Sequence, residues 1–141
     1  MNRRQFIRRL EVLTGGAAAL SAGGCLPFQF ANVTVAGRRL LVQTGDIGDR
    51  GVLVDPPGGQ LPIFVHRLAD GGYSAVSTRC MHRGCPVEPT ADRLVCPCHG
   101  SEYTYAGDVL RGPTERPLRR FEVVAGADVV AIELPAEGEV W

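Results

Sequence analysis

The chain has 141 residues, and its 15 acidic residues balance 15 basic ones, all of which are arginine. Without its first 25 residues the chain keeps 116, with 11 arginines against 14 carboxylates; this net charge of −3 gives no basic surface for a nucleic acid. A length of this order predicts one compact domain with a modest core and leaves no room for a second.

The N-terminus carries the first distinctive pattern. The run NRRQFIR at residues 2–8 precedes a weakly apolar stretch from Val12 to Gly24. This order resembles a twin-arginine export signal. A structural helix is the competing interpretation, but four glycines would weaken it, and the stretch is shorter and less apolar than a good membrane span. We therefore expect residues 1–25 to be an export signal.

Cys25 ends this segment in the run SAGGCL at residues 21–26, which resembles a lipoprotein processing site except that Ala22 replaces the usual large aliphatic residue. Three outcomes stay open: lipidation at Cys25, a plain signal with an incidental thiol, or an uncleaved anchor that associates with the membrane. In each of them the rest of the chain faces the periplasm or the outside, where a disulfide can persist.

Short runs rich in Val, Ile, Leu and Phe follow residue 25, separated by Gly and Pro, and none keeps a helical period. The domain is therefore expected to be nearly all β, with His66 an ordinary strand histidine. The turn Asp70-Gly71-Gly72 is predicted to join a hairpin. The predicted strands are Gln29–Val35, Arg39–Gln43, Gly51–Val54, Ile63–Leu68, Tyr73–Ser77, Arg93–Cys96, Glu102–Tyr105, Arg119–Val124 and Val129–Leu134.

The predicted domain covers residues 26–141 and has two parts. Residues 28–77 and 119–135 would form an antiparallel β-sandwich or small barrel as a base. The segment 78–118 would form a smaller subdomain at one end of that base. The prediction therefore places the residues of this segment at a tip.

Two runs in that segment contain metal-binding residues: CMHRGC at 80–85 and CPCHGS at 96–101. Each run offers one thiolate and one imidazole, which suits a [2Fe–2S] cluster with one iron held by sulfur and the other by nitrogen. A structural zinc site can also use two Cys and two His. Zinc leaves the second cysteine of each run unexplained. A zinc-stabilised or metal-free binding module is the remaining alternative.

Residues 78–118 resemble the Rieske iron–sulfur proteins of the disulfide-containing, high-potential kind, through the runs CMHRGCPV, CPCHGSEY, GDV, GP and PL. The resemblance implies a Rieske-type sandwich or barrel base with an inserted cluster-binding subdomain. It also implies that Cys80 and Cys96 hold one iron, that His82 and His99 hold the other, and that a disulfide links the two loops. The disulfide cysteines would be Cys85 and Cys98.

Two further residues stand at positions that tune the reduction potential in the family. There a serine hydroxyl donates to a bridging sulfide and a tyrosine hydroxyl to a ligand thiolate, and Ser101 and Tyr103 match them. Tyr103 and Tyr105 both lie on a predicted strand, and of the two we expect Tyr103 to face the cluster.

The sequence offers no candidate nucleophile and base with a substrate pocket, so we expect an electron carrier rather than an autonomous catalyst. One possibility is the iron–sulfur subunit of a quinol-oxidising respiratory complex that passes electrons to a cytochrome c-type acceptor, with cytochrome b and c subunits as partners. The alternative is the small subunit of an exported molybdenum oxidoreductase such as arsenite oxidase, with a molybdopterin subunit as partner. Arg83 departs from the first pattern, because an apolar residue usually follows the first ligand histidine and a guanidinium is costly to bury unpaired.

Overall fold

The computed structural model describes residues 27–141, which form eleven β-strands, one short 3₁₀ helix (Thr44–Asp46) and no α-helix. The predicted all-β fold is therefore confirmed for this part of the chain. The predicted export signal at residues 1–25 and lipidation at Cys25 lie outside the described residues. Within the described range, no helix is long and apolar enough to cross a membrane.

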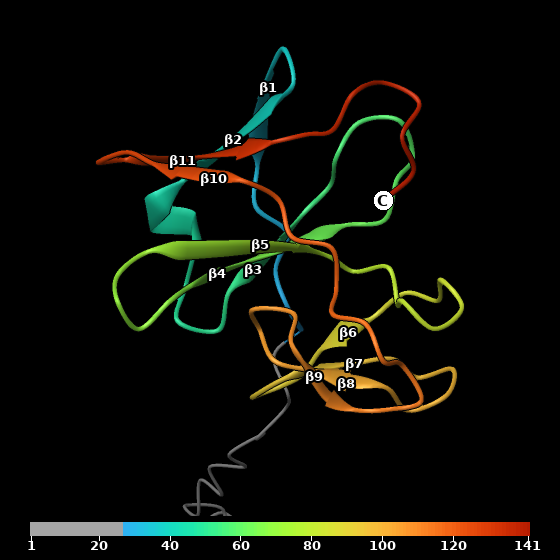
Figure 1. The fold of residues 1–141 in the computed structure, drawn as a ribbon. Helices are drawn as coiled ribbons and strands as arrows, with labels where there is room; N and C mark the ends of the chain where they lie inside the picture. The colour runs from blue at the N-terminus through green and yellow to red at the C-terminus, as the bar shows by residue number, and fades with distance from the viewer. Residues whose placement is uncertain (1–26) are drawn as a thin grey trace, which may run out of the picture.

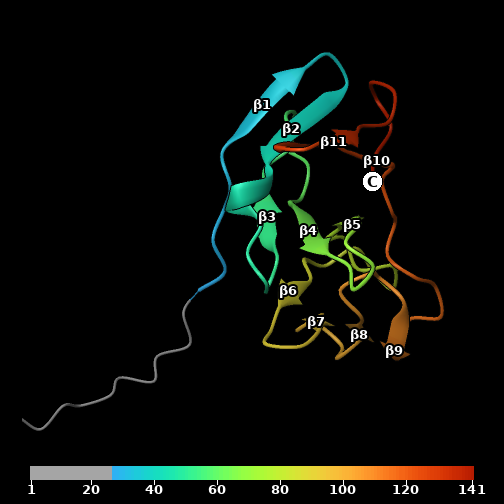
Figure 2. The same ribbon diagram turned by 90° about the vertical axis from the view of Figure 1, so that its left-hand side faces the viewer.

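The strands form three antiparallel sheets that are stacked one above the other (Figures 1 and 2). The first sheet has the order β1 (Val33–Ala36), β2 (Arg39–Gln43), β11 (Val129–Glu133) and β10 (Val123–Ala125). The second has the order β3 (Val52–Val54), β4 (Ile63–Arg67) and β5 (Tyr73–Ser77). The third has the order β6 (Glu88–Pro89), β7 (Leu94–Val95), β8 (Glu102–Tyr103) and β9 (Val109–Arg111).

The larger core lies between the first two sheets and follows the two-residue period of their strands. Leu40 and Val42 of β2 and Val130 and Ile132 of β11 are all fully buried. They belong to one cluster with the inward side chains of β3 and β4. These alternating aliphatic residues fix the register, because a slip by one residue would turn the buried set toward solvent.

The second sheet is buried on both faces, which explains the unbroken apolar run at the start of β4. Ile63 and Val65 belong to the larger core, whereas Phe64 between them belongs to a second cluster with Val76 of β5 and with Leu94 and Tyr103 of the third sheet. Burying a side chain of this size contributes about 1.5–3 kcal/mol. The third sheet is thus attached to the base mainly through the far face of β4 and β5.

The segment that carries the third sheet leaves the base and returns to it at adjacent positions. The chain departs after β5 and comes back beside it, where Ser77 N–H donates to Arg119 O and Phe121 N–H donates to Ala75 O, both at 2.9 Å. Val76 and Arg120 form an antiparallel bridge. The third sheet is therefore an insertion in a hairpin-like connection, as the fold prediction expected.

The predicted strands agree with the structure best in the base. Arg39–Gln43 and Tyr73–Ser77 match β2 and β5, and the predicted hairpin is the antiparallel pair β4–β5. The sequence did not indicate β6 or β9, whose two or three residues carry no alternation. The predicted strand Gln29–Val35 is divided, because Ala31 N–H donates to Leu53 O across to the second sheet before β1 begins.

Candidate metal centre

The two cysteine-containing loops have the same backbone hydrogen bonds. In the first, Gly84 N–H donates to Cys80 O at 2.8 Å; in the second, Gly100 N–H donates to Cys96 O at 2.9 Å. Both glycines have a φ of +78°, in the left-handed region that favours glycine. Cys80 N–H also donates to Cys85 O at 2.9 Å, and Cys96 N–H donates to Ser101 O at 2.8 Å. The sequences CMHRGC and CPCHGS therefore fold into equivalent turns.

The equivalent cysteines, Cys80 and Cys96, are buried free thiols with relative exposures of 2% and 1%. Burial acts to raise the pKa of Cys80, but hydrogen bonds from Tyr103 and from the N–H groups of His82 and Arg83 outweigh it and lower that pKa. Burial and the neighbouring Cys80 raise the pKa of Cys96, although N–H groups of its own loop oppose this. Each sulfur thus meets N–H donors that suit a thiolate.

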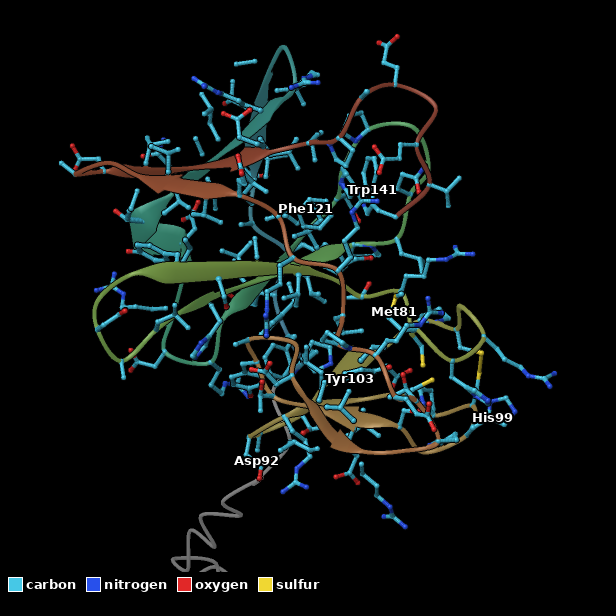
Figure 3. All side chains as sticks on the ribbon, viewed as in Figure 1. Met81, Asp92, His99, Tyr103, Phe121 and Trp141 are labelled. Atoms are coloured by element: carbon cyan, nitrogen blue, oxygen red, sulfur yellow. A yellow bond between two sulfur atoms is a disulfide. The ribbon has the colours of Figure 1, made fainter. Side chains whose placement is uncertain are left out.

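The two loop histidines come together at one end of the molecule. The ring centroids of His82 and His99 lie 4.8 Å apart with an interplanar angle of 89°. Nδ1 of His82 is buried without a hydrogen-bond partner among the described residues, whereas the His99 side chain is exposed. An unpartnered buried ring nitrogen is the kind of atom that a metal would satisfy. Figure 3 shows His99 and Met81 at this end of the molecule.

A disulfide between Cys85 and Cys98 joins the two loops, with a Cα–Cα distance of 6.5 Å. Their sulfurs lie within 4.8 Å of the Cys96 sulfur. Two sulfurs that are bonded to each other are not thiolates and do not serve as metal ligands in this form. Of these three cysteines, Cys96 alone can donate a thiolate, and the disulfide holds its loop against the other.

Tyr103 on β8 points at the first loop. Its fully buried hydroxyl lies 3.3 Å from Cys80 Sγ and accepts a hydrogen bond from Met81 N–H at 3.3 Å. Because the phenol accepts from the backbone, its own hydrogen is available to the sulfur. Tyr105 lies beyond the end of β8 and instead donates its hydroxyl to Thr90 O. Residues two apart on a regular strand share a face, so the two tyrosines diverge because β8 ends at Tyr103 and a turn follows it.

Sequence reasoning missed Thr114, which completes the surroundings of the two cysteines. Its N–H donates to the buried Ser101 hydroxyl at 3.2 Å, and its side chain contacts the Tyr103 phenol. Thr114 is only 5% exposed and follows a cis peptide bond between Gly112 and Pro113. No periodicity or charge in the run GPTERP distinguishes this threonine, so only the fold indicates its position.

His66 lies on β4 and takes no part in this group. Its ring stacks near Phe64 and lies 4.7 Å from the Tyr105 ring. Burial lowers the pKa of His66, against a hydrogen bond with the Asp49 backbone. This environment is that of a packed strand histidine.

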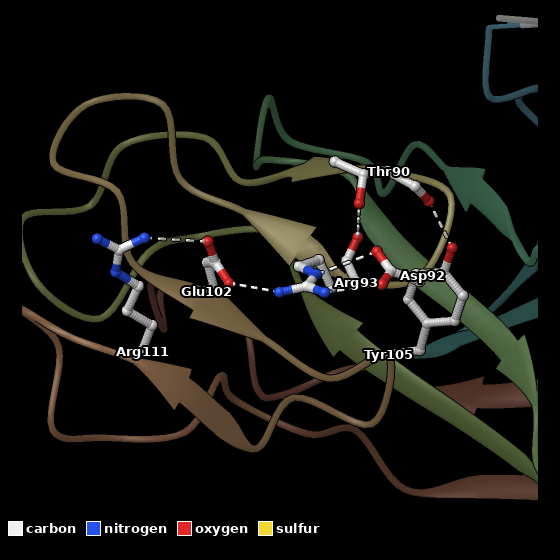
Figure 4. Close-up of polar contacts among 6 residues, drawn as sticks. All are labelled: Thr90, Asp92, Arg93, Glu102, Tyr105 and Arg111. Carbon is white, nitrogen blue, oxygen red and sulfur yellow. Dashed lines mark hydrogen bonds and ion pairs between the residues drawn. The ribbon is translucent and has the colours of Figure 1, made fainter.

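A network of charged side chains, separate from the cysteine site, links strands of the third sheet (Figure 4). Arg93 bonds both Asp92 and Glu102, at 2.8 and 2.7 Å, and Arg111 approaches the other oxygen of Glu102 at 3.7 Å. The hydrogen bond from Arg93 lowers the pKa of Asp92. Because Asp92 and Arg111 are largely exposed, their pairs stabilise the sheet only slightly, whereas Glu102 is 19% exposed.

The two buried thiols therefore interact with each other and the two imidazoles pack together, on equivalent loops that a disulfide joins. This donor set can hold a diiron cluster with unlike ends, and the backbone N–H groups around the sulfurs would offset the negative charge of thiolates and sulfides. Four such ligands could also surround a zinc ion. A buried tyrosine hydroxyl directed at one sulfur adds a further hydrogen bond, which serves a centre whose sulfur charge changes during its reaction.

Comparisons with known proteins agree with this site. The family model described as the Rieske [2Fe–2S] domain matches residues 29–122. The cytochrome b6-f complex iron–sulfur subunit of Prochlorococcus marinus strain AS9601 is 37% identical and covers 94% of this chain and 85% of its own length. The corresponding subunit of Chlorobaculum tepidum is 44% identical over 55 residues, and this match covers 38% of this chain and 30% of that relative.

Solved structures show the same fold. The plasma membrane Rieske protein PetC3 from Synechocystis PCC 6803 has a TM-score of 0.56 and 28% identity, and the match covers 64% of this chain and 94% of that one. A chain from the complex of oxygenase and ferredoxin in carbazole 1,9a-dioxygenase has a TM-score of 0.55 and 24% identity, with 72% and 100% covered. The second likeness concerns the fold alone.

Proposed function

The chain belongs to the Rieske [2Fe–2S] domain family and is an electron-transfer protein with a [2Fe–2S] cluster, and we propose that Cys80 and Cys96 bind one iron of that cluster and His82 and His99 the other. Two buried thiols and two imidazoles, whose ring centroids lie 4.8 Å apart, on equivalent loops support this assignment. When bound, the cluster takes up and releases one electron at a potential raised by its two neutral ligands.

The chain's own residues would set how that electron is held. The backbone N–H groups around Cys80 and Cys96 stabilise negative charge on the sulfurs, and so does the hydroxyl of Tyr103. Ser101 accepts a hydrogen bond from Thr114 N–H, which leaves its own hydrogen free for a sulfur of the cluster. All these interactions favour the reduced form, whose sulfurs carry more charge.

The exposed histidine would couple the electron to a proton. A metal-bound imidazole uses one ring nitrogen for the metal and keeps the other for a proton, whose pKa depends on the charge of the metal. His99 is exposed, so its free nitrogen can exchange a proton with a substrate or with water. Gain of an electron together with a proton suits the oxidation of a quinol.

We propose on this basis that the protein is the iron–sulfur subunit of a quinol-oxidising cytochrome complex. Relatives that cover most of this chain are named as cytochrome b6-f complex subunits, which supports cytochrome subunits as partners. The disulfide and the twin-arginine pattern at residues 2–8 support a location outside the cytoplasm. A precursor carrying Arg3→Lys and Arg4→Lys should remain in the cytoplasm of its host; normal export would contradict this part.

The ligand assignment is tested by electron paramagnetic resonance of the dithionite-reduced protein. The native protein should give the signal of a [2Fe–2S] cluster with mixed ligands, and His82→Cys should abolish it, because an all-sulfur or broken site has a different electronic structure. His66→Cys is the matched control and should keep the signal. A mixed-ligand signal that persists in His82→Cys would contradict the assignment.

The quinol step needs a separate test in the assembled complex. Membranes from the source organism that carry the native chain should reduce a cytochrome c-type acceptor with a short-chain quinol, and those that carry His99→Ala should not. Retained activity in that variant would exclude the histidine as the contact for the quinol.

A further inference from the structure

Three arginines lie in or beside the first cysteine loop. Arg83 lies in that loop, and its side chain is exposed. The guanidinium of Arg79 covers Gly84, since a Cβ on this glycine would meet its atoms at 3.1–3.4 Å. Arg116 reaches over from the 112–117 loop, and its Nη2 donates to Met81 O at 3.3 Å. These three residues are called the cationic tip below.

Equivalence of the two loops places Arg83 beside the histidines. Arg83 is the third residue after Cys80, and His99 is the third residue after Cys96. Because both turns close with the same hydrogen bonds, Arg83 occupies the position in the first loop that His99 occupies in the second. The ring of His82 lies next to that of His99, so a partner that approaches the histidines also meets the arginines.

The charges of the cationic tip are not neutralised within residues 27–141. No carboxylate there forms an ion pair with Arg79, Arg83 or Arg116, whereas other arginines of the same range do have carboxylate partners. Glu102 is on β8 and directly follows the second loop in sequence, but it already pairs with Arg93 and Arg111 (Figure 4). Exposed Glu115 is the one carboxylate in the three loops.

The charge is therefore divided along the molecule. The three loops at residues 79–87, 96–101 and 112–118 carry three arginines and one glutamate, a net charge of +2. Residues 27–141 as a whole carry −3, which leaves −5 for everything outside these loops. A molecule with a positive end and a negative body orients in the field of a charged partner and approaches it with the positive end first.

We propose that the cationic tip binds an acidic electron-transfer protein, which presents carboxylates around its own redox centre. The proposal rests on the proposed function in one respect, the position of the cluster beside His82 and His99. In the contact, the reduced cluster loses one electron and the oxidised centre of the partner gains it, with no bond made or broken. Arg83 and Arg79 pair with carboxylates there, which offsets the cost of removing their charges from water.

A redox protein fits this surface better than a lipid headgroup. Binding to a lipid surface does not require contact at the end where the cluster ligands lie, whereas electron transfer requires close approach to that end. The charges stand where a partner must dock for the electron to leave.

Stopped-flow oxidation of the reduced holoprotein tests the proposal, with an acidic plastocyanin and a basic mitochondrial cytochrome c as one-electron acceptors. At low ionic strength the plastocyanin should be reduced faster, and its rate should fall as salt is added, because charge attraction is screened. Arg79→Gln with Arg83→Gln should lower that rate about tenfold, within the range that electrostatic steering spans.

The matched control is Arg38→Gln with Arg67→Gln, which makes the same change in net charge. Both arginines are exposed and have no ion pair within the described residues, and they lie in the base. This variant should keep the plastocyanin rate to within about twofold. An equal loss in both variants would overturn the proposal, because net charge and not the cationic tip would then decide the rate.

Two further measurements separate docking from other effects. Rates with uncharged p-benzoquinone should be the same in both variants; a parallel loss with this oxidant in the tip variant would show an effect on the cluster and would overturn the proposal. Vesicles with phosphatidylglycerol should bind neither protein appreciably. Vesicle binding that the tip variant loses while its plastocyanin rate stays normal would assign the arginines to a membrane.

Resonance spectra and midpoint potentials are recorded for every sample before the kinetics. A native protein without the mixed-ligand signal would contradict the proposed function. A normal signal together with plastocyanin rates that do not depend on salt or on the tip arginines would contradict the acidic partner alone.

Discussion

Single hydrogen bonds decide much of the chemistry at this site, since each one acts on a sulfur whose charge changes by a fraction of an electron. The resemblance in the sequence identified Ser101 and Tyr103 as residues of interest, and the fold places both beside the cysteine loops. The sequence could not identify Thr114, because its contacts with Ser101 and Tyr103 cross between segments that only the fold brings together.

Tyr103→Phe should lower the midpoint potential of the cluster. The variant loses the hydrogen bond to Cys80 Sγ, which stabilises the more negative reduced state. A hydrogen bond contributes about 1 kcal/mol, and about 1.4 kcal/mol corresponds to ~59 mV for one electron, so the fall should be about 40 mV. Protein film voltammetry measures it. Tyr105→Phe is the control, and a potential unchanged in Tyr103→Phe would refute the role.

Thr114→Val should lower the potential by less than Tyr103→Phe does. The threonine hydroxyl contacts the phenol and donates to Arg116 O at 3.1 Å, so it helps to hold the 112–117 loop in place beside Tyr103. Thr114→Ser should restore the native potential, because it restores the hydroxyl. In a protein that already carries Tyr103→Phe, the valine substitution should have no further effect; an additive fall would show that Thr114 acts by another route.

Strands of the base were predictable and the short strands of the insertion were not. Apolar residues alternate along β2 and β11, and a glycine turn joins β4 to β5, so local patterns suffice there. The pair β6–β7 has two residues on each side and owes its geometry to Leu94 in the second core. Tertiary packing determines such elements, and their sequences show no period.

Gly51→Ala should destabilise the protein more than Gly37→Ala. Both glycines have positive φ, and for each an alanine costs roughly 1–2 kcal/mol of strain. A Cβ at Gly51 would also lie 2.5 Å from Phe64 Cζ and 2.7 Å from Val65 O, whereas none of the described atoms lies within 4 Å at Gly37. Overpacking adds about 1–3 kcal/mol. Denaturant unfolding measures both, and equal losses would contradict the close approach at β4.

At the scale of the whole molecule, the three-layer arrangement follows from the two-sided burial of the second sheet. The run Ile63-Phe64-Val65 was predicted as a strand, but which neighbours cover its two faces depends on a pairing between β2 and β11, far apart in sequence. The sequence indicated the tip through motifs at residues 80–85 and 96–101. Its charge pattern becomes visible only when Arg116 is placed beside them.

Removal of the disulfide should destabilise the whole molecule. Cys85→Ser with Cys98→Ser frees two loops that are 13 residues apart in the chain, and a link of this kind typically contributes about 2–4 kcal/mol. The midpoint of denaturant unfolding, followed by far-ultraviolet circular dichroism and by the visible absorption of the cluster, should fall for both signals. An unchanged midpoint would show that the core alone holds the loops together.

The side-by-side departure and return of the inserted segment has a practical consequence for protein engineering. Residues 77 and 119 are hydrogen-bonded neighbours in the base, so the piece between them begins and ends at almost one point. We therefore expect this piece to be transferable as one unit to a host that offers two adjacent antiparallel strands and an apolar side chain in the place of Phe64. A redox-inert scaffold would thereby acquire a ready-made electron relay without redesign of its own interior.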